Sequence, residues 1–219
     1  MKTANITSYL TLASPAQSET REKASKFLGF AFPVTSGEQI KAELEQLRKL
    51  HPKANHHCYA WRLGFDRQEY RAQDDGEPSG TAGKPILGQI DSFQLTEVLI
   101  VVVRYFGGTK LGTGGLIQAY RECAHKTLLE AEIITKSIKQ ELEIEFPYEF
   151  AGDVNHLIHQ SEGERNDEAF ADNIKLTISL PIDAIQSFVM KLKAIVGRIT
   201  LDEATNKEEI AHLVIRIKE

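Results

Sequence analysis

One segment in the middle of the chain constrains the fold more than any other, because it joins a strand to a long helix through a glycine-rich turn. Residues 97–106 are almost entirely valine, isoleucine, leucine and aromatic side chains. A run without polar alternation predicts a central strand that is buried on both faces. Residues 107–115 contain five glycines and predict a turn, and residues 116–134 predict a helix with one inward apolar face. The chain therefore requires a sheet that is covered by helices.

The segments before this strand predict further elements of the same layer structure. We expect strands at residues 27–34 and 57–63, helices at residues 37–50 and 81–93, and a loop or edge hairpin at residues 64–80. Ser36 is in position to cap the first of these helices. Together with the central strand they predict an N-terminal domain, residues 1–135.

The second half of the chain predicts a separate domain, residues 136–219. Its expected elements are strands at 142–150, 168–171 and 174–180, helices at 154–159 and 182–196, and strand-like segments at 199–201 and 210–217. The order β-α-β-β-α-β is typical of a ferredoxin-like sandwich. The place of segment 210–217 stays open, and the fold class as a whole is α+β.

Charge and cysteine content restrict the environment and the partners. Residues 1–135 carry 16 basic and 15 acidic side chains, whereas residues 136–219 carry 10 basic and 16 acidic ones. Any nucleic-acid contact is therefore expected in the first half. Three features predict a soluble, cytoplasmic protein without membrane contact. They are the presence of only two cysteines, the absence of an apolar leader, and a longest apolar run that covers only residues 98–103.

The glycine-rich turn predicts an anion site. Free amides at a helix N-terminus attract anions, and the basic side chains of Arg104 and Lys110 flank the turn. A tight strand-to-helix turn with crowded packing would explain the glycines equally well, but the two cations favour a ligand surface. We interpret one group as the anion-binding or nucleic-acid-binding set: His57, Lys84, Arg104, Lys110, Gly112, Thr113, Gly114, Gly115 and Arg121.

Other chemistries find less support in these residues. The glycines do not match the dinucleotide fingerprint, and Gly83-Lys84 lacks the remaining positions of a P-loop. Asp74, Asp75 and Glu77 would suit Mg²⁺, although such a run is more often a solvated turn. The spacing of His56, His57 and Cys58 fits no zinc site, and we assign no metal, no cofactor and no catalytic residue.

Several motifs in order resemble the YigZ/IMPACT family. They are the run from His56 to Trp61, the run from Asp74 to Pro85, the strand end that includes Arg104, Tyr105, Gly107 and Gly108, and the run from Gly112 to Tyr120. The same comparison marks His56, Asp74, Asp75, Glu77 and Gly83 as motif residues. The resemblance implies a first domain like domain two of ribosomal protein five, with a left-handed β-α-β fold. It also implies a second domain like domain V of elongation factor G.

The resemblance suggests a translation-linked role. Eukaryotic relatives restrain a starvation-sensing kinase by competing for its activator, but they carry a different accessory domain, so that partner does not transfer. We rank three hypotheses. The first is a non-enzymatic regulator that binds RNA or the ribosome through Lys84, Arg104, Lys110 and Arg121. The second is an enzyme acting on a small phosphorylated ligand through Asp74, Asp75, Glu77 and His57. The third is a module that binds a protein partner through residues 136–219.

Overall fold

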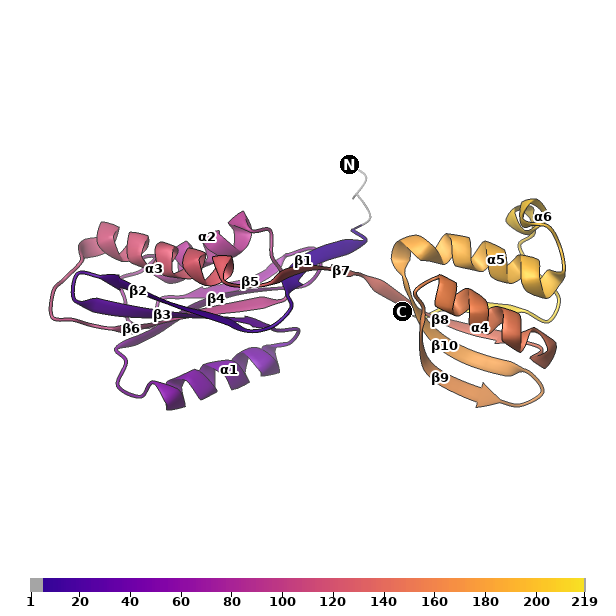
Figure 1. Ribbon diagram of the computed structural model, residues 1–219, viewed down its shortest axis with the longest axis horizontal. Helices are drawn as coiled ribbons and strands as arrows, with labels where there is room; N and C mark the ends of the chain where they lie inside the picture. Colours follow the sequence, from indigo (N-terminus) through magenta and orange to yellow (C-terminus); the bar gives the residue numbers. More distant parts are fainter. Residues whose placement is uncertain (1–5, 219) are drawn as a thin grey trace. The chain divides into compact units, whose positions relative to one another are not determined.

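The computed structural model describes residues 6–218 and divides the chain into two compact units (Figure 1). One unit is Ser8–Lys136. The other begins at Ser137 and also includes Ile6 and Thr7. Both units combine a sheet with helices, so the α+β class predicted from the sequence is confirmed.

A five-stranded sheet forms the middle of the N-terminal unit, in the order β2-β3-β6-β4-β5. The strands are β2 (Ala16–Glu22), β3 (Ser25–Pro33), β4 (His56–Leu63), β5 (Glu69–Gln73) and β6 (Val98–Tyr105). β6 lies at the centre and pairs antiparallel with both β3 and β4. The expected edge hairpin is present, because β5 pairs antiparallel with β4.

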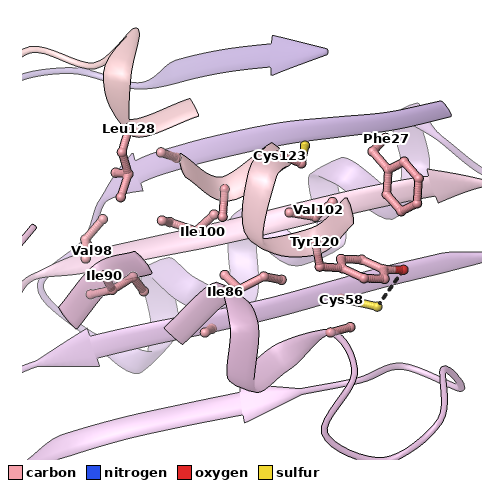
Figure 2. Close-up of a cluster of buried hydrophobic side chains, with 14 of the residues drawn as sticks. Phe27, Cys58, Ile86, Ile90, Val98, Ile100, Val102, Tyr120, Cys123 and Leu128 are labelled. Atoms are coloured by element: carbon pink, nitrogen blue, oxygen red, sulfur yellow. Dashed lines mark hydrogen bonds between the residues drawn. The ribbon is translucent and has the colours of Figure 1, made fainter. Parts of the chain in front are cut away.

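Helices cover both faces of this sheet, as Figure 1 shows. α1 (Gly37–Leu50) lies on one face, and α2 (Gly83–Ser92) and α3 (Gly112–Leu129) lie on the other. Side chains alternate along β6, so Val98, Ile100 and Val102 pack under α2 and α3 (Figure 2). The residues between them pack under α1. This double burial explains the uninterrupted apolar run of the sequence.

Two predicted boundaries of the long helix are wrong. α3 begins at Gly112 rather than at residue 116, and it ends at Leu129 rather than at 134. The residues after it form β7 (Ile133–Ser137), which pairs with β1 (Ser8–Leu12) in a separate two-stranded sheet. Backbone hydrogen bonds join Ala13 to Glu132 and Thr7 to Ile138, which makes the pair antiparallel.

The C-terminal unit has a four-stranded antiparallel sheet in the order β11-β8-β10-β9. Its elements are β8 (Lys139–Phe146), α4 (Ala151–Gln160), β9 (Glu164–Phe170), β10 (Ile174–Pro181), α5 (Ile185–Gly197), α6 (Leu201–Asn206) and β11 (Val214–Ile217), with short 3₁₀ turns at Tyr148–Phe150 and Ile182–Ala184. Apolar side chains of α4 and α5 pack on one face of the sheet. The element order and strand order are those of a ferredoxin-like sandwich.

Residues 199–217 correct the sequence-based prediction at two points. The segment 199–201 is not a strand, because Thr200 caps α6 through a capping box with Glu203. The tail forms a strand only at Val214–Ile217, and this β11 supplies the fourth strand of the sandwich by pairing with β8. The first strand also ends early, because Pro147 follows Phe146 and a 3₁₀ turn begins there.

Candidate functional site

A hollow of about 430 Å³ opens at the N-terminal end of α3. Four parts of the N-terminal unit surround it: the start of β4, the turn before α2, the end of β6 and the first turn of α3. Its lining residues are His56, Glu77, Pro78, Arg104, Phe106, Lys110, Leu111, Gly112, Thr113 and Leu116. The structure thus joins the predicted glycine turn to one residue of the predicted acidic turn.

The first turn of α3 supplies backbone amides to this hollow. Gly112 adopts φ +75, which favours glycine, and the helix continues through Thr113, Gly114 and Gly115. Within residues 6–218, no side chain caps this end of the helix. The first amides of a helix have no intrahelical acceptor, and the helix dipole adds partial positive charge to them. This end of α3 is therefore suited to an anion.

Arg104 is not the free cation that the sequence predicted. Arg104 is only 4% exposed, and its Nη1 donates to Oε1 of Glu77 at 2.6 Å. The hydroxyl of Tyr120 donates to the same Oε1 at 2.7 Å. The charge of Arg104 is thus compensated inside the protein, and Tyr120 holds Glu77 in place from α3.

Glu77 and His56 contribute hydrogen-bond acceptors to the lining of the hollow. Oε2 of Glu77 accepts no hydrogen bond from residues 6–218 and is not among the fully enclosed unpartnered atoms of that range, so part of its surface is accessible. The Nδ1 atom of His56 lies 2.8 Å from the carbonyl of Asp75. A carbonyl only accepts, so Nδ1 is the donor and Nε2 of the neutral ring is an acceptor. That Nε2 lies 3.8 Å from Oε1 of Glu77.

Lys110 and Phe106 form the outer wall of the hollow. Lys110 is exposed and takes part in no ion pair with any residue between 6 and 218. Phe106 is 44% exposed, so part of its ring is accessible. Among residues 6–218, Lys110 is thus a cation without an ion-pair partner, and it lines the hollow with the exposed Phe106 beside the amides of α3.

Asp74 and Asp75 have structural partners. Asp74 accepts hydrogen bonds from the amides of Gly80, Ala82 and Gly83 at 2.8–3.0 Å, at the start of α2. Burial raises the pKa of Asp74, but these amide bonds outweigh it and leave the pKa below its ordinary value. Asp75 accepts from the backbone amide of His57 at 2.6 Å. In the part of the chain from 6 to 218, no three potential ligands converge on a metal position.

Several predicted site residues lie away from this hollow. His57 and Tyr105 alternate with His56 and Arg104 along their strands, so they face α1, where Tyr105 bonds to His51. Lys84 and Arg121 line a second hollow of about 390 Å³ over α2 and α3. The four predicted cations therefore do not form one set.

Two predicted motif glycines permit close packing. A Cβ atom on Gly107 would lie 1.9 Å from the carbonyl oxygen of Ala24, and one on Gly83 would lie 2.4 Å from the amide nitrogen of Gln73. Gly108 adopts φ +87 in the loop beside Gly107. The crowded-turn interpretation of the glycines at 107–115 therefore holds for Gly107, and Gly83 is crowded as well.

Sequence reasoning missed Tyr120 and Phe106 as members of the site. The interior of the N-terminal unit contains Tyr120, whose hydroxyl lies 3.3 Å from the sulfur of Cys58 (Figure 2). Burial raises the pKa of the Cys58 thiol well above its ordinary range, which disfavours the thiolate that nucleophilic attack requires. A tyrosine on the inward face of a helix usually needs a polar partner for its hydroxyl group. This need was the sequence signal that could have pointed to a buried acceptor such as Glu77.

No helix within residues 6–218 is long and apolar enough to cross a membrane.

Comparisons with known proteins agree with the motif resemblance. The family model of the Impact N-terminal domain matches residues 23–128. The IMPACT family member YigZ of Escherichia coli (strain K12) is 35% identical over 187 residues, which cover 84% of this chain and 92% of that protein. The protein IMPACT homolog of Saccharomyces cerevisiae is 38% identical over 95 residues, or 42% of this chain and 36% of that protein. A crystal structure described only as that of a hypothetical protein has a TM-score of 0.71 and 32% identity, and the match covers 97% of this chain and 98% of the other. The motifs that surround the α3 hollow are thus those of a known group, and the chain belongs to the IMPACT family.

Proposed function

We propose that this chain is a non-enzymatic, translation-linked regulator that binds single-stranded RNA, free or in the ribosome, through the hollow at the N-terminus of α3. The observation that carries the proposal is the meeting of three features in one hollow: helix amides that no side chain of residues 6–218 caps, a Lys110 ammonium group without an ion-pair partner in that range, and the exposed ring of Phe106. We place this activity in the cytoplasm, in keeping with two cysteines that are buried and unpaired.

Each feature suits a different part of a nucleotide. A phosphate group binds well at a helix N-terminus, where amides and dipole act together. Lys110 adds a charge that neutralises phosphate and releases counterions. An accessible aromatic ring provides a surface on which an unpaired base can stack. The combination therefore favours a single strand over a duplex, whose bases are not free to stack.

The geometry gives less support to the enzyme hypothesis. Asp74 and Asp75 are engaged by backbone amides, and His57 faces α1. Of the residues in that hypothesis, only Glu77 lines the hollow. Binding without catalysis is thus the better-supported function of this site.

Fluorescence anisotropy with a labelled eight-nucleotide RNA tests the proposal. Lys110→Ala should weaken binding and lower the salt slope of the binding constant by about one unit. Phe106→Ala should cost about 1–3 kcal/mol of binding free energy through lost stacking. Lys191→Ala, a change on α5 of the C-terminal unit, is the matched control and should bind as the wild type does.

Co-sedimentation with ribosomes extends the same test to the ribosome. The wild type and Lys191→Ala should enter the ribosome pellet at low salt, and Lys110→Ala should do so less. Absence of RNA binding at low salt by protein that is folded, as judged by its tryptophan fluorescence, would refute the proposal.

A further inference from the structure

We propose that the α3 hollow distinguishes RNA from DNA by accepting a hydrogen bond from a ribose 2′-hydroxyl on Oε2 of Glu77, with Nε2 of His56 as the neighbouring acceptor. This inference rests on the proposed function and names the class of nucleic acid that the same site takes. The ligand is a ribonucleotide unit within a single strand.

Glu77 is the observation that points to a hydrogen-bond donor on the ligand. The residue is only 9% exposed and lines the hollow. Its Oε1 already accepts from Arg104 and Tyr120, whereas its Oε2 accepts nothing from residues 6–218. Oε2 is not fully enclosed and has no donor within residues 6–218, and a hydrogen bond to a carboxylate is stronger than one between neutral groups, so the hollow favours a ligand that brings a donor.

His56 extends this acceptor surface. Because Nδ1 donates to the carbonyl of Asp75 at 2.8 Å, the neutral ring presents Nε2 as an acceptor. His56 and Glu77 lie together, with 3.8 Å between Nε2 and Oε1. Phosphate oxygens are acceptors as well, and a carboxylate repels them. This part of the hollow therefore suits a hydroxyl group and excludes a phosphate.

The two halves of the hollow are thus chemically opposite. Amides of Gly112 and Thr113 and the ammonium group of Lys110 suit a phosphate, and Glu77 with His56 suits a donor. In RNA, the 2′-hydroxyl is a donor close to the backbone phosphate, and it is the group by which proteins distinguish RNA from DNA. A volume of about 430 Å³ suits one nucleotide unit of a strand.

The test uses the wild-type protein and three oligomers of one sequence that contains only A, C and G. The oligomers are RNA, DNA and 2′-O-methyl RNA, each labelled and eight nucleotides long, and binding is followed by anisotropy at one low salt concentration. We expect RNA to bind about tenfold or more tightly than DNA, as for a hydrogen bond to a charged group. The 2′-O-methyl RNA, which lacks the donor, should bind no better than DNA.

Two protein variants separate the halves of the hollow. Lys110→Ala should weaken RNA and DNA by the same factor and leave their ratio unchanged. His56→Phe keeps a ring at this position and should lower the RNA-to-DNA ratio.

The other outcomes overturn the inference in distinguishable ways. Equal binding of RNA and DNA would refute the 2′-hydroxyl contact but would leave the proposal of single-strand binding intact. If none of the three oligomers binds, both the proposed function and this inference are refuted.

Discussion

Removing Glu77 should destabilise the N-terminal unit strongly, and the structure sets the size of the effect. In Glu77→Ala, the guanidinium group of Arg104 stays buried at 4% exposure without its 2.6 Å partner. Breaking a buried ion pair in this way costs about 3–5 kcal/mol. Tyr120 also loses its acceptor, at about 1–3 kcal/mol, but both donors share Oε1, so the two costs are not additive. We expect a loss of about 4 kcal/mol, out of a total stability of about 5–15 kcal/mol for a domain.

Urea unfolding followed by tryptophan fluorescence measures this loss. The chain has a single tryptophan, Trp61, which lies in β4, so its signal reports the N-terminal unit. The variants are Glu77→Ala, Arg104→Met and the double variant, which together form a double-mutant cycle. The double variant should be more stable than the sum of the single losses predicts, by about 2 kcal/mol or more, because it leaves no buried charge behind.

The exposed Lys110 provides the control, since it lines the same hollow but makes no buried contact. Lys110→Ala should change stability by no more than about 0.5 kcal/mol. A loss below about 1 kcal/mol for Glu77→Ala, or single losses that simply add, would refute the assignment of a buried, coupled ion pair at this site.

Three further predictions concern other parts of the chain. Gly107→Ala should lower the urea midpoint, because the new Cβ would lie 1.9 Å from the carbonyl oxygen of Ala24. Gly37→Ala is the control and should leave the midpoint unchanged, because a Cβ there meets no atom within 4 Å. Equal midpoints for the two variants would contradict the packing role of Gly107. Burial, together with nearby positive charge, holds the pKa of His57 below its ordinary value of 6.5, so the unfolded chain takes up the proton first as the pH falls. This stabilisation should therefore be present above about pH 6.5 and be lost as the pH falls below it, and His57→Phe should flatten this slope in urea midpoints; an unchanged slope would count against it. Thr200→Ala removes the cap of α6 and should cost about 1 kcal/mol in a thermal melt followed by circular dichroism, while an unaltered melting temperature would show that the capping box contributes nothing.

Sequence patterns predicted the buried elements of the fold, but they missed β2 and found β9 only in part, since a strand was expected at 168–171 and β9 spans Glu164–Phe170. β6 was predictable because helices cover both of its faces, so all its side chains but the last two are apolar. β2 and β9 lie at sheet edges, and every residue of β9 is exposed, so neither carries a clear hydrophobic period. The error at 199–201 was avoidable, because Thr200 and Glu203 have the spacing of a capping box.

The candidate site was predictable in place but not in its electrostatics. The structure places Lys110 and the first residues of α3 on the lining of a hollow, and its binding of an anion stays a prediction. The pairing of Arg104 with Glu77 joins residues 27 positions apart, and neither residue's neighbours in the sequence reveal it. The family resemblance predicted from the motifs is confirmed by the family model over residues 23–128 and by the identity with YigZ.

The antiparallel pair of β1 and β7 has a consequence for how this fold can be combined with others. Because Thr7 bonds to Ile138, the chain enters and leaves the N-terminal unit at neighbouring points. A unit with adjacent ends can be inserted into a surface loop of another protein, or be joined end to end and reopened elsewhere, at little cost in loop-closure entropy. The N-terminal unit thus has the geometry of a domain that can be transferred into another protein. Its attachment points lie on the β1–β7 strand pair, which is distinct from the five-stranded sheet that bears the hollow.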